Sequence, residues 1–164
     1  MARQPEIESN KASADRWNAI VSGLNELFDQ LMTAPAACRL EHNPRLPKEP
    51  GVYLFLESGR PMYVGQTRNL RQRIANHCRP SGSDNHATFA FLLAQRFGCT
   101  RRGSEDAQAR FARSGICRGV HNAKTRVAAM EVKFVRCDDP ELRTVSEVFV
   151  AVQLRTPHND FETH

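Results

Sequence analysis

The chain has 164 residues, of which 40% are hydrophobic and 25% are charged. These values lie close to the globular average and exclude wholesale disorder, and the length suits one domain with a modest core. The formal net charge of +5 at pH 7 favours a polyanionic partner, because phosphates attract a basic surface over a long range. We expect no membrane partner, since no run of residues has the length and apolarity of a membrane span.

The cysteines point to a reducing compartment. Their number is odd, their spacing is irregular and no two of them form a CxxC pair, which favours free thiols over a disulfide framework. The opening residues MARQPEIESN lack the apolar segment of a signal peptide. We therefore expect a cytoplasmic protein. The five positions are Cys38, Cys78, Cys99, Cys117 and Cys137.

A long amphipathic helix is predicted over residues 12–32, after ten polar residues that we expect to be frayed. An apolar stripe this wide must be covered by something. We expect it to pack on the domain as an extra layer, and the alternative is a homodimer contact. The stripe consists of Trp17, Ile20, Val21, Leu24, Leu27, Phe28 and Leu31. A proline-rich loop over residues 34–50 follows the helix.

The stretch 51–77 organises the rest of the chain. Two short apolar runs, 52–56 and 62–64, flank the turn sequence Glu-Ser-Gly-Arg-Pro, and this pattern predicts a β-hairpin. Gly65 closes the second strand. Thr67 or Asn69 then suits the N-cap of a helix that begins near residue 70.

One face of this helix carries an unusual mixture of residues. Arg73 and His77 share the face with apolar side chains at helical spacing. The interpretation without chemistry is an arginine that extends past the edge of the core and a histidine that caps the helix C-terminus. The face consists of Leu70, Arg73, Ile74 and His77.

Residues 78–129 are predicted to form a helical insertion, with helices over 87–97, 105–113 and 123–129 and an irregular stretch over 114–122. The insertion is rich in arginine, and arginines also cluster after the hairpin. We expect these side chains to bind nucleic-acid phosphates. They are Arg68, Arg71, Arg110, Arg113 and Arg118.

A third strand and a last helix follow the insertion. Residues 130–137 alternate between apolar and polar, which predicts a strand with Met130, Val132, Phe134 and Arg136 on one face. Asp139 and Pro140 form a helix start, and the helix is predicted to run to about residue 155. Its expected core stripe is Leu142, Val145, Val148, Phe149 and Val152.

Glu147 lies on another face of this last helix, among apolar residues. A carboxylate in such surroundings is costly unless it is paired or bound to a metal. The alternative is an ordinary solvated glutamate. Together these elements predict an α+β fold, in which a small antiparallel three-stranded sheet is flanked by helices. We expect the N-terminal helix and loop over 1–50, and one globular unit with the helical insertion over 51–164.

Two separated blocks of residues resemble the GIY-YIG nuclease family. The first block is GVY at 51–53 and YVG at 63–65 with Arg73 on the next helix, and the second is Glu147 followed by Asn159. The blocks stand in the family's order. Gln66 departs from the excision-repair members, which have a lysine there.

The resemblance implies a metal-dependent DNA endonuclease that hydrolyses phosphodiester bonds. Glu147 would be the single carboxylate ligand of Mg²⁺ or Mn²⁺, and Arg73 would bind the phosphate. Tyr53 and Tyr63 would orient the attacking water. His77 would relay a proton, although either it or a tyrosine suits the role of proton acceptor.

The remaining motif residues have supporting roles in this interpretation. Asn159 would hold the ends of the site together by hydrogen bonds, and Gly65 would be structural. His86 and His158 are weaker candidates for the site. Two alternatives remain: a catalytically silent nucleic-acid-binding module, and a partner-binding protein built on the N-terminal helix and the insertion. The structure of the DNA substrate is left open.

Overall fold

The computed structural model describes residues 4–37, 46–78, 88–95 and 118–159. The predicted helix over 105–113 lies outside these ranges. No helix within the described ranges is both long and apolar enough to cross a membrane. In chain order the elements are α1 (Gln4–Thr33), β1 (Gly51–Glu57), β2 (Arg60–Thr67), α2 (Leu70–Cys78), α3 (Thr88–Gln95), α5 (Arg118–Ala128), β3 (Glu131–Arg136) and α6 (Pro140–Leu154).

The three strands form one antiparallel sheet with the order β2-β1-β3. The predicted fold class is therefore confirmed. The hairpin turn is tighter than predicted, because Glu57 already pairs with Arg60. Ser58 and Gly59 between them have φ angles of 52° and 76°, and two left-handed residues make a turn whose twist matches that of the flanking strands.

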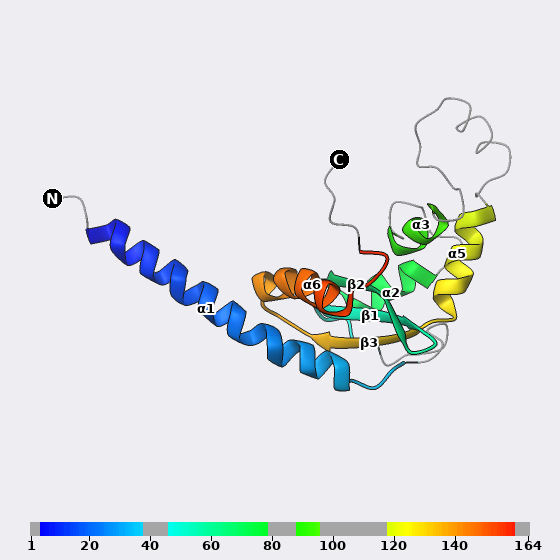
Figure 1. The fold of residues 1–164 in the computed structure, drawn as a ribbon, viewed down its shortest axis with the longest axis horizontal. Coiled ribbons are helices and arrows are strands. Elements are labelled where there is room, and N and C mark those ends of the chain that lie inside the picture. The colour runs from blue at the N-terminus through cyan, green and yellow to red at the C-terminus, as the bar shows by residue number, and fades with distance from the viewer. Residues whose placement is uncertain (1–3, 38–45, 79–87, 96–117, 160–164) are drawn as a thin grey trace, which may run out of the picture.

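Helices cover both faces of the sheet (Figure 1). Alternate residues of a strand point to opposite faces, so each face has its own core. The first core lies under α2, α3 and α5 and includes Tyr53, Phe55, Tyr63, Leu70, Ile74, Phe89, Leu93, Val127 and Val132. The second core lies under α1 and α6 and includes Leu27, Leu31, Val52, Leu54, Leu56, Val64, Val150 and Ala151.

Helix α1 begins at Gln4, so the expectation that residues 1–10 fray is wrong from that residue onward. Proline at the second helical position is compatible with a helix start. Four members of the apolar stripe are buried, namely Ile20, Leu24, Leu27 and Leu31. Trp17 is 54% exposed and Val21 is 43% exposed, and the N-terminal half of α1 projects away from the domain (Figure 1).

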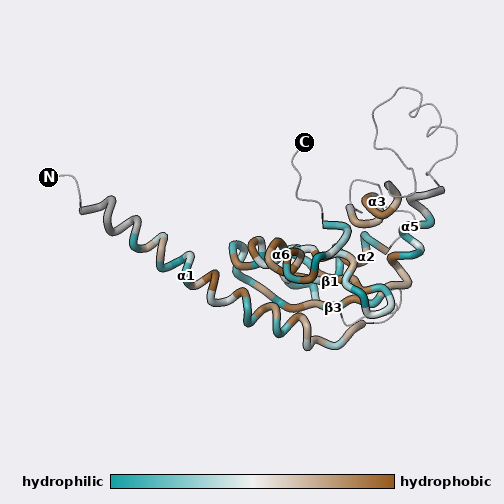
Figure 2. Tube along the Cα trace, in the orientation of Figure 1, coloured by the Kyte–Doolittle hydropathy of each residue, from teal (hydrophilic) through white to brown (hydrophobic). Residues whose placement is uncertain are grey.

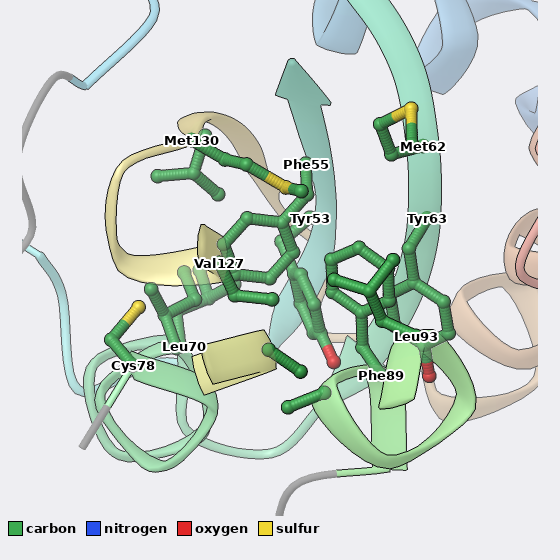
Figure 3. Close-up of a cluster of buried hydrophobic side chains, with 14 of the residues drawn as sticks. Tyr53, Phe55, Met62, Tyr63, Leu70, Cys78, Phe89, Leu93, Val127 and Met130 are labelled. Atoms are coloured by element: carbon green, nitrogen blue, oxygen red, sulfur yellow. The ribbon is translucent and has the colours of Figure 1, made fainter. Parts of the chain in front are cut away.

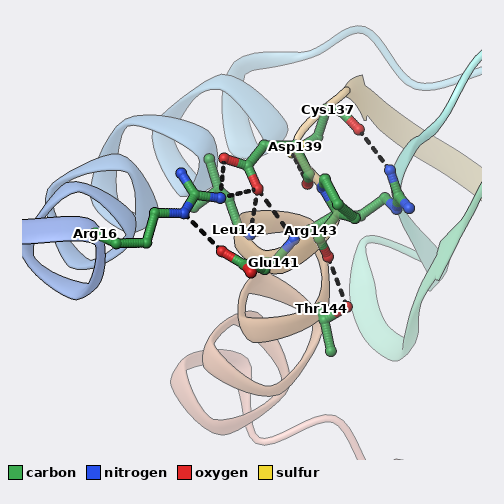
Figure 4. Close-up of polar contacts among 8 residues, drawn as sticks. Arg16, Cys137, Asp139, Glu141, Leu142, Arg143 and Thr144 are labelled. Carbon is green, nitrogen blue, oxygen red and sulfur yellow. Dashed lines mark hydrogen bonds and ion pairs between the residues drawn. The ribbon is translucent and has the colours of Figure 1, made fainter. Parts of the chain in front are cut away.

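From residue 11 of α1 onward, hydrophobic and hydrophilic residues alternate along the helix (Figure 2). The projecting half still has a contact with α6, through Arg16. This guanidinium donates to the Asp139 carboxylate at 2.7 Å and to Glu141 Oε2 at 2.6 Å (Figure 4). Asp139 also caps α6, accepting from the backbone N–H groups of Glu141 and Leu142, as the sequence predicted.

The core stripe predicted for α6 is wrong at two of its positions. Val148 is 46% exposed and Val152 is 63% exposed. The buried face is rotated toward β2 and consists of Arg143, Ser146, Val150 and Ala151. The physical reason is that two layers compete for the helix: the sheet takes this face, and α1 packs on the neighbouring one, where the rings of Phe28 and Phe149 meet edge to face at 6.1 Å.

The insertion contributes directly to the first core. Phe89 and Leu93 of α3 and Val127 of α5 are buried there. Helix α5 begins at Arg118, so the prediction of an irregular stretch over 114–122 is wrong for its last five residues. The helical predictions over 87–97 and 123–129 are confirmed over 88–95 and 123–128.

Candidate active site

Tyr53 and Tyr63 lie side by side on neighbouring strands, with ring centroids 6.4 Å apart (Figure 3). Tyr53 is fully buried and pairs across the sheet with Gly65. A Cβ atom on Gly65 would lie 2.3 Å from the Tyr53 hydroxyl oxygen and 2.4 Å from the ring carbon that carries it. A glycine is therefore required here for the Tyr53 phenol to cross the neighbouring strand.

The Tyr53 hydroxyl joins two residues of α2. His77 Nε2 lies 2.9 Å from it, and Arg73 Nε donates to it at 3.3 Å. Because Arg73 occupies the phenol as an acceptor, we assign the Tyr53 O–H as donor to His77 Nε2. His77 is fully buried, so the interpretation of this histidine as a helix C-terminal cap is wrong.

Burial, assisted by the charge of Arg73, lowers the pKa of His77 to about 3. The imidazole is therefore neutral at physiological pH. Its Nδ1 atom is buried and has no hydrogen-bond partner in the described structure. The pKa of Tyr53 is raised, chiefly by burial and also by Tyr63, although Arg73 opposes the shift. The buried phenol and imidazole thus form a neutral pair.

Tyr63 is the phenol nearer the surface, with 6% of the residue exposed. Its ring stacks on Phe89 with centroids 4.7 Å apart and planes 7° from parallel. Burial and the Glu147 charge raise its pKa, whereas the charge of Arg73 and hydrogen bonding with Arg73 and Tyr53 lower it. Phe89 was not predicted at the site, since the sequence showed only that it belongs to an apolar helix.

Glu147 reaches this cluster from α6. Its charge interacts with Arg73, Tyr63 and Tyr53. Burial raises the pKa of its carboxyl group to about 7, although Arg73 opposes the shift. The interpretation as an ordinary solvated glutamate is therefore wrong. A half-buried carboxylate at the site gains stability from a cation, and this electrostatic demand fits a hard divalent ion.

Such an ion would have few protein ligands. Among the residues that the structure describes, no group of three or more His, Cys, Asp or Glu side chains is placed to hold a metal. Mg²⁺ commonly binds through one or two carboxylates and keeps several waters. Glu147 as the single carboxylate ligand is compatible with this mode of coordination.

Asn159 attaches the C-terminal segment to β2. Its Oδ1 accepts from Val64 N and its Nδ2 donates to Val64 O, both at 2.9 Å. Because β2 is an edge strand, this amide completes hydrogen bonds that no further strand supplies. Thr156, which the sequence did not indicate, donates to Asn159 Oδ1 at 2.7 Å.

A buried arginine lies close to the same strand. Arg143 is 5% exposed, and it donates to Gln66 Oε1 at 3.1 Å and to Cys137 O at 3.0 Å (Figure 4 shows the second bond). Both acceptors are neutral. No sequence pattern singled out Arg143, because a charged residue in an amphipathic helix is normally solvated.

The predicted phosphate-binding arginines are only partly described. Arg68 and Arg71 are exposed, while Arg110, Arg113 and His86 lie outside the described residues, as does the Arg118 side chain. His158 is buried, and its ring centroid lies 5.5 Å from that of Phe89.

Residues 49–105 match the family model described as the UvrC-like GIY-YIG domain. The resemblance to the GIY-YIG nuclease family is confirmed. The matched segment contains Tyr53, Tyr63, Arg73 and His77. Glu147 lies beyond it, and the fold brings this residue to the GIY-YIG cluster.

Curated relatives match over the same part of the chain. UvrABC system protein C of Deinococcus radiodurans is 42% identical over 45 residues, 27% of this chain and 7% of that protein. The Maricaulis maris protein of the same name is 40% identical over 58 residues, which cover 35% of this chain and 8% of that protein. The chain thus spans less than a tenth of the length of these relatives.

A solved structure is also similar. It is the GIY-YIG N-terminal endonuclease domain of UvrC from Thermotoga maritima, bound to its catalytic divalent cation, magnesium. The identity is 15%, the match covers 82% of this chain and 97% of that one, and the TM-score is 0.37.

Proposed function

We propose that this protein is a metal-dependent DNA endonuclease that hydrolyses phosphodiester bonds with one divalent cation. The observation that carries the proposal is the meeting of two phenols, an arginine and a carboxylate at the β2 edge of the sheet. Tyr53, Tyr63 and Arg73 interact there with Glu147, which follows them by at least 74 positions in the chain. The family match over 49–105 supports the same activity.

Mg²⁺ or Mn²⁺ is the cation that we propose for Glu147. The carboxylate is half-buried and its raised pKa reflects a charge that the protein alone stabilises poorly. When bound, the cation would supply charge neutralisation at the phosphate and lower the pKa of a bound water. The magnesium in the Thermotoga maritima domain is consistent with this choice but carries no weight by itself.

Arg73 is the proposed phosphate ligand. Its Nε is held by the Tyr53 hydroxyl at 3.3 Å, which fixes the direction of the guanidinium. A planar guanidinium keeps its charge at any physiological pH and matches the geometry of phosphate oxygens. Tyr53 therefore acts on the substrate through Arg73.

Tyr63 is the proposed contact to the attacking water. It is the more exposed phenol, and it is hydrogen-bonded to Tyr53, which in turn bonds His77. Tyr63, Tyr53 and His77 thus form a chain from the surface to the core. Among the described residues His77 accepts from Tyr53, so we assign it to the far end of this chain. With a pKa of about 3 it stays neutral there and fixes the orientation of the phenol.

DNA is the proposed substrate, and the cytoplasm remains the expected compartment. The net charge of +5 and the exposed Arg68 and Arg71 favour phosphates, and we propose the same role for Arg110, Arg113 and Arg118.

The test is a digestion panel of single-stranded, duplex and branched DNA, with RNA included, in Mg²⁺, Mn²⁺ or EDTA. We expect metal-dependent cleavage of DNA that Glu147→Gln abolishes. Binding without cleavage would instead identify a catalytically silent nucleic-acid-binding module. If the protein shows no DNA binding and no cleavage, a partner-binding protein is favoured.

A homodimer through α1 is a second, separate proposal. Trp17 and Val21 expose an apolar strip on this helix, and aromatic side chains are enriched at protein interfaces. Trp17→Ser should shift sedimentation from dimer to monomer without lowering the melting temperature. A wild-type protein that sediments as a monomer at high concentration would contradict this proposal.

A further inference from the structure

A hollow of about 270 Å³ lies on the outer side of α2. Two cations and three side-chain amides line it, and the described lining contains no carboxylate and no aromatic ring. The neighbouring Glu49 carboxylate is paired with Arg136 at 2.7 Å, and the two charged residues of the lining are both cations. The lining residues are Lys48, Asn69, Arg71, Gln72, Ala75 and Asn76.

The hollow is held by the backbone. The loop before β1 docks on the first turn of α2, where Leu70 N donates to Glu49 O at 3.0 Å and Arg71 N donates to Pro47 O at 2.9 Å. Arg71 Nε donates to Leu46 O at 2.6 Å. Lys48 is therefore fixed beside α2 although its own side chain is exposed.

These contacts decide which groups face a ligand. Loop carbonyls occupy the N–H groups of Leu70 and Arg71, and Asn69 Oδ1 accepts from Gln72 N at 3.0 Å. The helix N-terminus is therefore already satisfied. An anion in the hollow would be bound by the side chains of Lys48 and Arg71, with the amides as further donors.

The hollow continues the active site along the helix. Asn69 and Asn76 stand four positions before and three positions after Arg73, and residues at this spacing lie on one side of a helix. The distance that the two asparagines span along the axis is about 10 Å. Arg71 lies two positions from Arg73 and faces another side of the helix. A strand that places a phosphate on Arg73 would thus pass along the edge of the hollow that Asn69 and Asn76 form.

We propose that this hollow binds a phosphate of the DNA strand next to the one that is cleaved. The inference rests on the proposed function, because it takes Arg73 as the ligand of the scissile phosphate. A hollow without an aromatic ring offers no platform for base stacking. Lys48 and Arg71 would accordingly recognise the charge of the backbone and not the sequence of bases.

The test compares Lys48→Gln with Lys11→Gln, which makes the same change at an exposed position of α1. Binding of a fluorescein-labelled DNA duplex is followed by anisotropy over a range of KCl concentrations. For Lys48→Gln the slope of log K against log[salt] should fall by about 0.9, the value for one lost phosphate contact. Lys11→Gln should keep the wild-type slope.

A second measurement locates the contact on the strand. Single uncharged methylphosphonate linkages are placed in turn at each position around the cleavage site. Wild type should show a cleavage defect at one position beside the scissile phosphate, and Lys48→Gln should lose that positional defect. An unchanged salt slope together with an unchanged pattern of defects would overturn the proposed phosphate contact while cleavage itself stands.

The binding arm also separates this inference from the proposed function. If DNA binds and Lys48→Gln lowers the salt slope as expected, but no cleavage occurs, the phosphate contact in the hollow is supported and the proposed nuclease activity is contradicted. A wild-type protein that neither binds nor cleaves DNA would overturn both.

Discussion

The two faces of the sheet differ in what they bury. Under α2, α3 and α5, the rings of Tyr53, Tyr63 and His77 pack against Phe55 and Phe89, and the polar atoms of Tyr53 and His77 meet inside the core. Under α1 and α6, the strands meet mainly aliphatic side chains such as Leu31 and Val150. Both faces use alternate residues of the same strands.

This contrast indicates a division of labour. The aliphatic face buries mainly apolar side chains, whose burial stabilises the sheet directly, although Arg143 and Ser146 of α6 are also buried and Ser146 Oγ has no hydrogen-bond partner in the described structure. The aromatic face includes an orphaned His77 Nδ1, and Glu147 at the strand edge is half-buried with a shifted pKa. Buried groups of this kind cost stability, and shifted pKa values cluster at functional sites. The predictions below test whether chemistry and stability really separate in this way.

The largest effect should come from Glu147→Gln, which keeps the size of the side chain and removes its charge. We expect single-turnover cleavage to fall by at least about 100-fold, because charge stabilisation at the phosphate is lost. DNA binding should persist. Glu26→Gln on exposed α1 is the control and should cleave like wild type.

The same variant should be more stable than wild type in EDTA at pH 8. Burial raises the pKa of Glu147 to about 7 from an ordinary 4.5, so the folded state holds its proton to higher pH than the unfolded state. Stability is therefore lost as pH rises through this window. Urea unfolding should show a gain on the order of 1–3 kcal/mol at pH 8, which disappears near pH 4. If the free energies of unfolding of Glu147→Gln and wild type are equal at both pH values, the burial of a charge is contradicted.

Leu31→Ala should damage the aliphatic face without touching the chemistry. Leu31 is fully buried, and removing such a side chain costs about 2–5 kcal/mol. Urea unfolding measures the loss. The cleavage rate per folded molecule should stay at the wild-type value, and a matching loss of rate would show that the two faces are coupled.

Gly65→Ala should damage both properties. Its Cβ would overlap the Tyr53 phenol, and overpacking of this kind costs about 1–3 kcal/mol. The cleavage rate should also fall, because the Tyr53 phenol is displaced from Arg73. Gly23→Ala is the control: its Cβ would meet only the flexible end of Leu142 at 3.1 Å, so the cost should be smaller.

His77→Gln should change how stability depends on pH. The pKa of His77 is lowered to about 3 from 6.5, so the unfolded state takes up a proton before the folded state does, and stability falls as pH drops below 6.5. Between pH 7 and pH 5 wild type should lose about 2 kcal/mol more than the variant. Parallel pH profiles in urea unfolding would mean that His77 is not held neutral.

Asn159→Ala should have the smallest effect. It leaves Val64 N–H and C=O without their partner, at a cost of about 1–2 kcal/mol. Hydrogen exchange of the Val64 amide should accelerate. Thr156→Val is the matched control, because it removes only the bond to Asn159 Oδ1 and should leave that amide protected.

The sequence by itself determined the local elements. Hairpin, third strand and capped helices follow from turn residues, alternation and N-cap chemistry, which act over a few neighbouring residues. The two motif blocks were also recognisable, because Tyr53, Tyr63, Arg73, Glu147 and Asn159 keep their order along the chain.

Only the tertiary structure decided which faces these elements present and which residues meet. The buried side of α6 depends on how α1 and the sheet share that helix, and periodicity alone therefore misplaced Val148 and Val152. The stacking of Phe89 on Tyr63 joins an insertion helix to the hairpin. The meeting of Glu147 with Arg73 spans 74 positions, and its raised pKa arises from burial that no local pattern specifies.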